Sequence, residues 1–194
     1  NVFRISATEI VLEYNNPANE GYAQVYLQPK GMKSSKHTFT KGDFGLNSAE
    51  NEEMEGHEGP ATTKEGFKWY LDVEAGAELF IWKTWGALQV GAGWSANADL
   101  HVKSIKLHTT DIPGNIKSIS VVCAYSDEAN QKKAELYAKV GGENFGTRKS
   151  LINDMSTYTF TDSISASGEI ELIWDSQEAG ISYFIKSVEV IYQD

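Results

Sequence analysis

The stretch SIKLHTTDIPGNIKSISVVCAY occupies residues 104–125 and contains two runs in which apolar and polar residues alternate. The segment DIPGN at 111–115 separates the two runs. Alternation with a period of two is typical of a β-strand with one buried face, whereas Asp, Pro, Gly and Asn are residues that turns favour. The stretch therefore predicts two β-strands joined by a tight connection.

The same alternation continues along nearly the whole chain, and glycine-, proline- and asparagine-rich segments interrupt it. The predicted strands are 9–14, 22–28, 67–73, 78–82, 87–92, 101–107, 116–125, 134–140, 157–162, 169–174 and 183–192. No window of useful length has the 3.6-residue period of a helix. Because one antiparallel sheet of this size would leave a face uncovered, we predict an all-β chain that forms an antiparallel β-sandwich, in the manner of a jelly roll.

A short motif, (Ile/Val)-Lys-Ser-(Ile/Val)-x-(Leu/Val), occurs at 102–107, 116–121 and 185–190. The lysine has the parity of the later apolar residues, so a regular strand would place it at the rim of the sandwich with its alkyl stem over the edge. The leading Ile or Val then lies on the other face or marks a β-bulge. Cys123 alternates with inward apolar residues, which predicts a buried structural thiol.

The composition limits the possible partners. The 194 residues carry a formal net charge of −10, with a pI near 4.9, and such a surface repels nucleic acid and anionic membranes. The single cysteine excludes an intramolecular disulfide and a multi-cysteine zinc site. No apolar run is long enough to span a bilayer. The chain begins with NVFRIS rather than an export signal, which fits a mature chain from which such a signal has been removed.

The run SAENEEMEGHEG at 48–59 is strongly acidic and has no apolar periodicity, which is typical of a solvated loop. Clustered carboxylates also bind hard cations such as Ca²⁺, although the spacing here matches no EF-hand. We treat the solvated loop as the main interpretation and a Ca²⁺ site as the alternative.

Catalytic motifs are not evident in the sequence. The histidines at positions 37, 57, 101 and 108 have no metal-binding spacing and no adjacent nucleophile, and VGGENFG at 140–146 reads as a hairpin turn rather than a phosphate loop. A glycosidase needs two carboxylates that meet in space, which one sequence does not reveal. The acids near strand ends that we considered for such a pair are Asp72, Glu78, Asp99 and Asp175.

The stretch LFIWKTWGALQVGAGWSAN at 79–97 carries three tryptophans. Trp82 lies within an apolar strand and is predicted to be in the core. Trp85 and Trp94 lie among glycines and small polar residues, where an amphipathic ring is often half exposed. The side chains that this stretch and its flank offer to a sugar are Trp85, Trp94, Lys83, Gln89, Asn97 and Asp99. The alternative is that Trp85 and Trp94 close one end of the sandwich.

Several motifs occur in a fixed order: GALQVGAG, IPGNIKSISV, VGGENFG, TYTFT, EIELIW and YFIKSVEVIY. In this order they resemble a pattern of secreted and surface-anchored proteins from Bacteroides-type gut bacteria. The resemblance covers about residues 86–192, with weaker similarity at 39–46 and 66–69. It implies a galactose-binding-like jelly roll, similar to carbohydrate-binding modules, with residues 36–194 as its body and residues 1–35 as additional N-terminal strands of one domain.

The resemblance also implies a location outside the cytoplasm, at the cell surface or in the periplasm, often on a lipoprotein anchored through a removed N-terminal segment. It supplies no catalytic residues. The leading functional hypothesis is a non-catalytic module that binds a glycan. The alternatives are a structural or adhesive module that contacts another surface protein and, more weakly, a glycoside hydrolase with an unrecognised carboxylate pair.

Overall fold

The computed structural model describes residues 3–5, 8–10, 31–46, 54–55, 59–73, 78–82, 84–91, 102–126, 133–176 and 180–193. Strands dominate these residues, and the one helical segment among them is the 3₁₀ turn η1 at Asp43–Gly45. In this described part of the chain no helix has the length and apolarity needed to cross a membrane.

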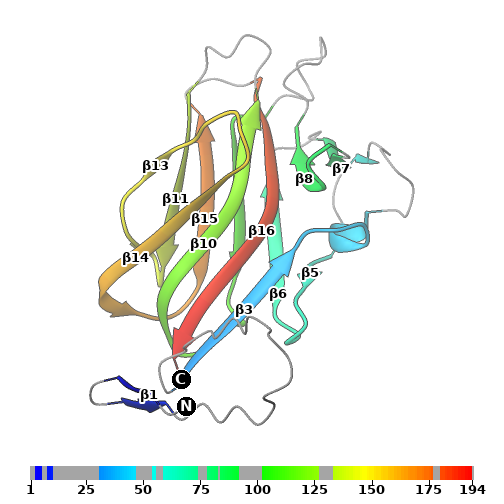
Figure 1. Cartoon of the computed structure of the whole chain (residues 1–194). Helices are drawn as coiled ribbons and strands as arrows, with labels where there is room; N and C mark the ends of the chain where they lie inside the picture. Colours follow the sequence, from blue (N-terminus) through cyan, green and yellow to red (C-terminus); the bar gives the residue numbers. More distant parts are fainter. Residues whose placement is uncertain are drawn as a thin grey trace, which may run out of the picture.

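Two antiparallel sheets make up most of the described fold (Figure 1). Sheet I contains, from edge to edge, β14 (Ser156–Ala166), β10 (Asn115–Ser126), β16 (Ser182–Gln193), β8 (Ala87–Val90), β7 (Glu78–Trp82) and β4 (Met54–Glu55), and β3 (Met32–Thr38) also pairs with β16. Sheet II contains β12 (Glu143–Asn144), β11 (Ala134–Val140), β15 (Ile170–Ser176), β9 (Ser104–Thr109), β6 (Lys68–Val73) and β5 (Ala61–Thr62), and β13 (Lys149–Ser150) also pairs with β11. A separate hairpin is formed by β1 (Phe3–Ile5) and β2 (Thr8–Ile10).

From β9 onward the chain crosses repeatedly between the sheets. β9, β11 and β15 belong to sheet II, whereas β10, β14 and β16 belong to sheet I. The inward residues of both sheets form one large buried cluster, with alternating burial along β9, β11 and β15. Each sheet thus covers the apolar face of the other, and the prediction of an all-β antiparallel sandwich is confirmed.

The lysine motif marks irregularities in the strands. The register of β10 shifts between Ile116 and Ser118, and Lys186 of β16 is the extra residue opposite the step from Val122 to Cys123. An extra residue reverses the parity of a strand, so the motif's first apolar residue and the one three positions later both face inward. The buried pairs are Val102 and Ile105, Ile116 and Ile119, and Ile185 and Val188. The β-bulge alternative is therefore correct for the copies in β10 and β16.

Cys123 is fully buried and unpaired with another cysteine, as predicted. Burial in the core raises the pKa of its thiol to about 12, because the apolar surroundings disfavour the thiolate; the nearby Trp174 indole has a smaller, opposite effect. The thiol is therefore protonated at neutral pH and serves as a small apolar core residue.

Some predicted elements differ from the structure. Of the segment 9–14 the structure describes residues 9 and 10, which belong to the β1–β2 hairpin, whereas 11–14 and 22–28 lie outside the described residues. The strand β3, with sequence MKSSKHT, was not predicted because it has no apolar alternation, yet it pairs with β16 along seven residues. Its place is determined by pairing with an apolar partner strand and not by its own composition.

The prediction that Trp82 belongs to the core is wrong. Leu79 is in the main core, and Trp82, on the opposite face of β7, packs on a separate cluster formed by Ala87, Ala124 and Phe184. A strand with apolar residues on both faces does not reveal which face the second sheet covers. Trp82 thus lies half-buried on the outer side of sheet I.

Candidate functional site

The outer face of sheet II carries polar side chains because its strands bury every second residue. Strand register places these outward residues in two adjacent rows that run across β6, β9, β15 and β11. One row is Asp72, Lys106, Ile173 and Tyr137, and the other is Tyr70, His108, Glu171 and Lys139. Residues that are up to about a hundred positions apart in the sequence therefore share one surface.

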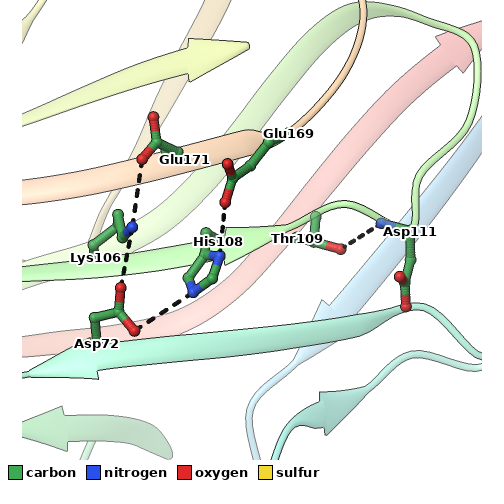
Figure 2. A network of polar contacts seen from close by, with 7 residues as sticks. All are labelled: Asp72, Lys106, His108, Thr109, Asp111, Glu169 and Glu171. Atoms are coloured by element: carbon green, nitrogen blue, oxygen red, sulfur yellow. Dashed lines mark hydrogen bonds and ion pairs between the residues drawn. The ribbon is translucent and has the colours of Figure 1, made fainter. Parts of the chain in front are cut away.

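Four of these outward side chains, together with Glu169, which directly precedes β15, form a continuous set of contacts that we name the polar chain: Glu171, Lys106, Asp72, His108 and Glu169 (Figure 2). Lys106 Nζ lies 3.5 Å from Glu171 Oε1 and 3.1 Å from Asp72 Oδ2. His108 Nε2 lies 3.5 Å from Asp72 Oδ1, and its Nδ1 lies 2.9 Å from Glu169 Oε1. Acidic and basic groups alternate along the chain, so each base contacts two acids.

The contacts of the polar chain shift the pKa values of Asp72 and Lys106. Partial burial works against the charge on Asp72, but the hydrogen bond and charge of Lys106, with a contribution from His108, outweigh it and lower the pKa of Asp72. The hydrogen bond to Asp72 raises the pKa of Lys106 against the opposing effect of burial, and Glu171 adds to the increase. Asp72 and Lys106 are therefore both ionised at neutral pH.

These shifts predict how the polar chain contributes to stability as pH changes. The lowered pKa of Asp72 gives stability that is present above its ordinary value of 3.8 and is lost as pH falls through the folded-state value. The raised pKa of Lys106 gives stability that is present below its ordinary value of 10.5 and is lost as pH rises through the folded-state value. The contribution is thus largest between these two pH limits.

We expect Lys106→Met to lower the free energy of unfolding by at most about 1 kcal/mol at pH 7, because the pair is largely exposed. Urea denaturation of wild type and variant at pH 3, 7 and 11 measures the difference. The difference in the free energy of unfolding between wild type and variant should be smaller at pH 3 and at pH 11 than at pH 7. A difference at pH 3 as large as that at pH 7 would show that Lys106 acts through packing of its alkyl stem and not through Asp72.

Backbone contacts attach β9 to β6 beside the polar chain. The backbone N–H of Asp111 donates to Thr109 Oγ1 at 3.1 Å (Figure 2). Asp111 Oδ2 accepts the backbone N–H of Lys68 at 2.9 Å. Thr109 is buried. The two hydrogen bonds tie the turn after β9 to the start of β6, and these two strands carry Asp72, Lys106 and His108 of the polar chain.

Aromatic and apolar groups accompany the polar chain. The ring of Tyr70 is 5.8 Å from that of His108, and Tyr70 is 41% exposed. A surface hollow of about 250 Å³ is lined by Asp72, Val73, Ser104, Ile105, Lys106 and Ile173, and it therefore includes two members of the polar chain. The guanidinium of Arg148 covers the ring of Tyr137, which lies on β11; the guanidinium carbon is 4.2 Å from the ring centroid. The face thus combines an exposed ring with groups that accept and donate hydrogen bonds.

Two of the six predicted site residues lie in the described part of the chain. Trp85 is half-buried in the turn between β7 and β8, with its ring edge-on to Phe184 at 4.7 Å, and it contacts the cluster outside sheet I. Gln89 is fully buried, and its Nε2 donates to the backbone oxygen of Gly91 at 2.9 Å. Lys83, Trp94, Asn97 and Asp99 lie outside the described residues.

Sequence reasoning missed most of the polar chain. The sequence marks Asp72 as a strand-end acid and shows no nucleophile adjacent to His108, and it does not single out Lys106, Glu169, Glu171 or Tyr70. The available signal was the polar parity of KWYLDV, SIKLHT and EIELIW. Of the other strand-end acids, Asp175 lies opposite Glu135 on the same face, whereas the Glu78 side chain and Asp99 are not described.

The metal alternative rests on the acidic run at 48–59, whose side chains lie almost entirely outside the described part of the chain. Among the residues that are described, no three His, Cys, Asp or Glu side chains gather in a way that would hold a metal ion. The Ca²⁺ site stays a prediction for the acidic run.

Comparisons with known proteins give structural similarity only. No protein-family profile matches the chain, and no curated protein matches it. Among solved structures, a family 29 carbohydrate-binding module is similar with a TM-score of 0.46 and 13% identity, over 83% of this chain and 90% of that one. A family 61 module in complex with β-1,4-galactotriose has a TM-score of 0.42 and 10% identity, over 65% and 88%. A family two carbohydrate esterase from Cellvibrio japonicus has a TM-score of 0.42 and 11% identity, over 83% and 35%.

Proposed function

We propose that this chain is a non-catalytic carbohydrate-binding module whose ligand lies on the outer face of sheet II. The observation that carries the proposal is the exposed Tyr70 ring next to His108 of the polar chain. A sugar presents an apolar C–H face and a rim of hydroxyl groups, so it is recognised by a flat ring together with fixed donors and acceptors. Tyr70 supplies the ring, and Asp72, His108 and Glu169 supply the polar groups.

The protonation of the polar chain favours binding over hydrolysis. A glycosidase requires one protonated carboxyl group, with a raised pKa, to donate a proton to the leaving oxygen. The pKa of Asp72 is instead lowered, and Lys106 lies between Asp72 and Glu171 and contacts both. Ionised carboxylates in ion pairs are suited to accept hydrogen bonds from hydroxyl groups and not to act as general acids.

The proposal includes the location expected from the sequence, outside the cytoplasm, where polysaccharides are accessible. It also retains Trp85, Trp94, Lys83, Gln89, Asn97 and Asp99 as a second candidate contact region for a glycan, with Trp85 the ring that the structure describes as half-buried. Gln89 is buried, and its role in that region would be to hold the turn at Gly91 through its hydrogen bond to the Gly91 backbone oxygen. Trp85 and Gln89 lie with sheet I, whereas the polar chain lies on sheet II, so substitutions at Trp85 and Tyr70 test the two regions separately.

We expect Tyr70→Ala to weaken glycan binding by roughly fivefold to thirtyfold, because loss of a stacking ring removes on the order of 1–2 kcal/mol of apolar contact. Tyr70→Phe keeps the ring and should retain most of the affinity. Affinity gel electrophoresis against a panel of soluble polysaccharides measures the effect, with dissociation constants expected in the micromolar to millimolar range. Thermal melts of each variant verify the fold.

Three variants serve as comparisons. Trp85→Ala and Trp94→Ala report on the second contact region, and Ile164→Ala removes an exposed side chain from β14 in sheet I. Loss of binding in a tryptophan variant with Tyr70→Ala unaffected would move the ligand to the tryptophan region. Absence of binding to every polysaccharide tested would contradict the proposal and favour a structural or adhesive module.

A further inference from the structure

We propose that the outer face of sheet II selects uncharged glycans and excludes glycans that carry carboxylate or sulfate groups. This inference rests on the proposed function and adds the chemical class of the ligand. It follows from the balance of charge on the polar chain and from the contacts that already occupy its cationic groups.

Negative groups outnumber positive ones at the centre of this face. The polar chain has carboxylates at Asp72, Glu169 and Glu171, against the Lys106 ammonium and the His108 ring. It is net negative whether His108 is neutral or protonated. An anionic sugar placed beside Tyr70 would add like charge at short range, where repulsion is poorly screened.

Two cations on this face, Lys106 and Arg148, already have acidic partners. Lys106 Nζ contacts Asp72 and Glu171, so a ligand carboxylate would have to displace both. At the β11 end, Arg148 Nη1 lies 3.4 Å from Glu135 Oε2, and its guanidinium covers the Tyr137 ring. At Lys106 and Arg148 an anionic ligand thus meets cations whose charge is already compensated.

Acceptors on the same face are accessible to an uncharged ligand. The side chains of Asp72 and Glu169 are 58% and 41% exposed, and their contacts with Lys106 and His108 leave lone pairs free. Carboxylates held in place are strong acceptors for hydroxyl groups. Hydroxyl-rich, uncharged sugars match this arrangement, whereas acidic sugars replace donors with further acceptors.

The test compares two charge reversals that change the net charge equally. Glu169→Lys alters the polar chain, and Glu189→Lys alters the outer face of sheet I, where Glu189 is similarly exposed and lies near Lys36. Wild type and both variants are run in affinity gels that contain neutral galactomannan, β-glucan or xylan, or acidic polygalacturonate, alginate or heparin. Thermal melts verify folding, and Glu169→Gln serves as a milder second variant.

We expect the wild type to be retarded by a neutral polysaccharide and not by any acidic one. Glu169→Lys should gain at least severalfold retardation by an acidic polysaccharide, with a smaller gain for Glu169→Gln, and Glu189→Lys should gain none. Retardation of the wild type by an acidic polysaccharide would overturn this inference and leave the proposed function standing. Equal gains for Glu169→Lys and Glu189→Lys, or no gain for either Glu169 variant, would overturn the role of the polar chain. Failure of the wild type to bind any of the six would refute the proposed function itself.

Discussion

Trp174→Ala is expected to lower the free energy of unfolding by about 3–5 kcal/mol, which is the usual cost of removing a large aromatic side chain from a core. Trp174 is fully buried, and strand register places it between Leu136 and Ile105 in the middle of sheet II. Its indole lies against the Cys123 thiol of sheet I, without a hydrogen bond of regular geometry. The substitution therefore leaves a cavity between the sheets.

Thermal melts and urea denaturation measure this loss, and a chain of this size should lose roughly 6–20 °C in Tm. Ile164→Ala is the control, because Ile164 is 74% exposed on β14 and its loss should change stability by at most about 0.5 kcal/mol. Similar stability changes in the two variants would contradict the placement of Trp174 between the sheets.

Gly141→Ala is the second substitution with a large expected effect. Gly141 and Gly142 join β11 to β12 with φ values of 61° and 88°, as a two-residue hairpin of the primed type requires. A Cβ atom at Gly141 would lie 2.5 Å from the backbone oxygen of Ser167, whereas one at Gly142 would have no atom within 4 Å. The backbone at Ser167 has to move to admit the methyl group.

Both alanine variants should lose about 1 kcal/mol from the positive φ, and Gly141→Ala should lose a further 1–3 kcal/mol from steric overlap. Urea denaturation of the two variants separates the contributions, since they share the backbone strain and differ in the overlap. If Gly142→Ala is the more destabilised variant, the hairpin does not pack on the turn at Ser167 in the manner described.

The strands that could be predicted are those whose own residues alternate. The segment 134–140 was predicted with the bounds of β11, and 183–192 lies within β16. In both, the period of two and the turn residues at each end are local properties. β3 could not be predicted in this way, because its burial depends on β16, which follows it by about 150 residues.

Trp82 and Trp85 show the same limit at the level of faces. Alternation places Leu79 and Trp82 on opposite faces of the strand. Both faces are apolar, so the sequence does not show which of them packs against sheet II. In the structure Leu79 faces the core, and the two tryptophans pack around Phe184 on the outside of sheet I. Which face of β7 is buried in the core therefore depends on the side on which sheet II packs.

The sequence by itself determined an all-β fold, the inward parity of Cys123 and its neighbours, and the hairpin at Gly141 and Gly142, because turn preference and strand periodicity act over a few residues. Only the tertiary structure decided that Asp72, Lys106, His108 and Glu169 meet on one face. Their contacts depend on the register between β6, β9 and β15, and register is determined by which strands pair across the whole sandwich. A shift of one residue in any of these strands would turn its polar side chains into the core, so the burial of the apolar residues between them holds the polar chain together.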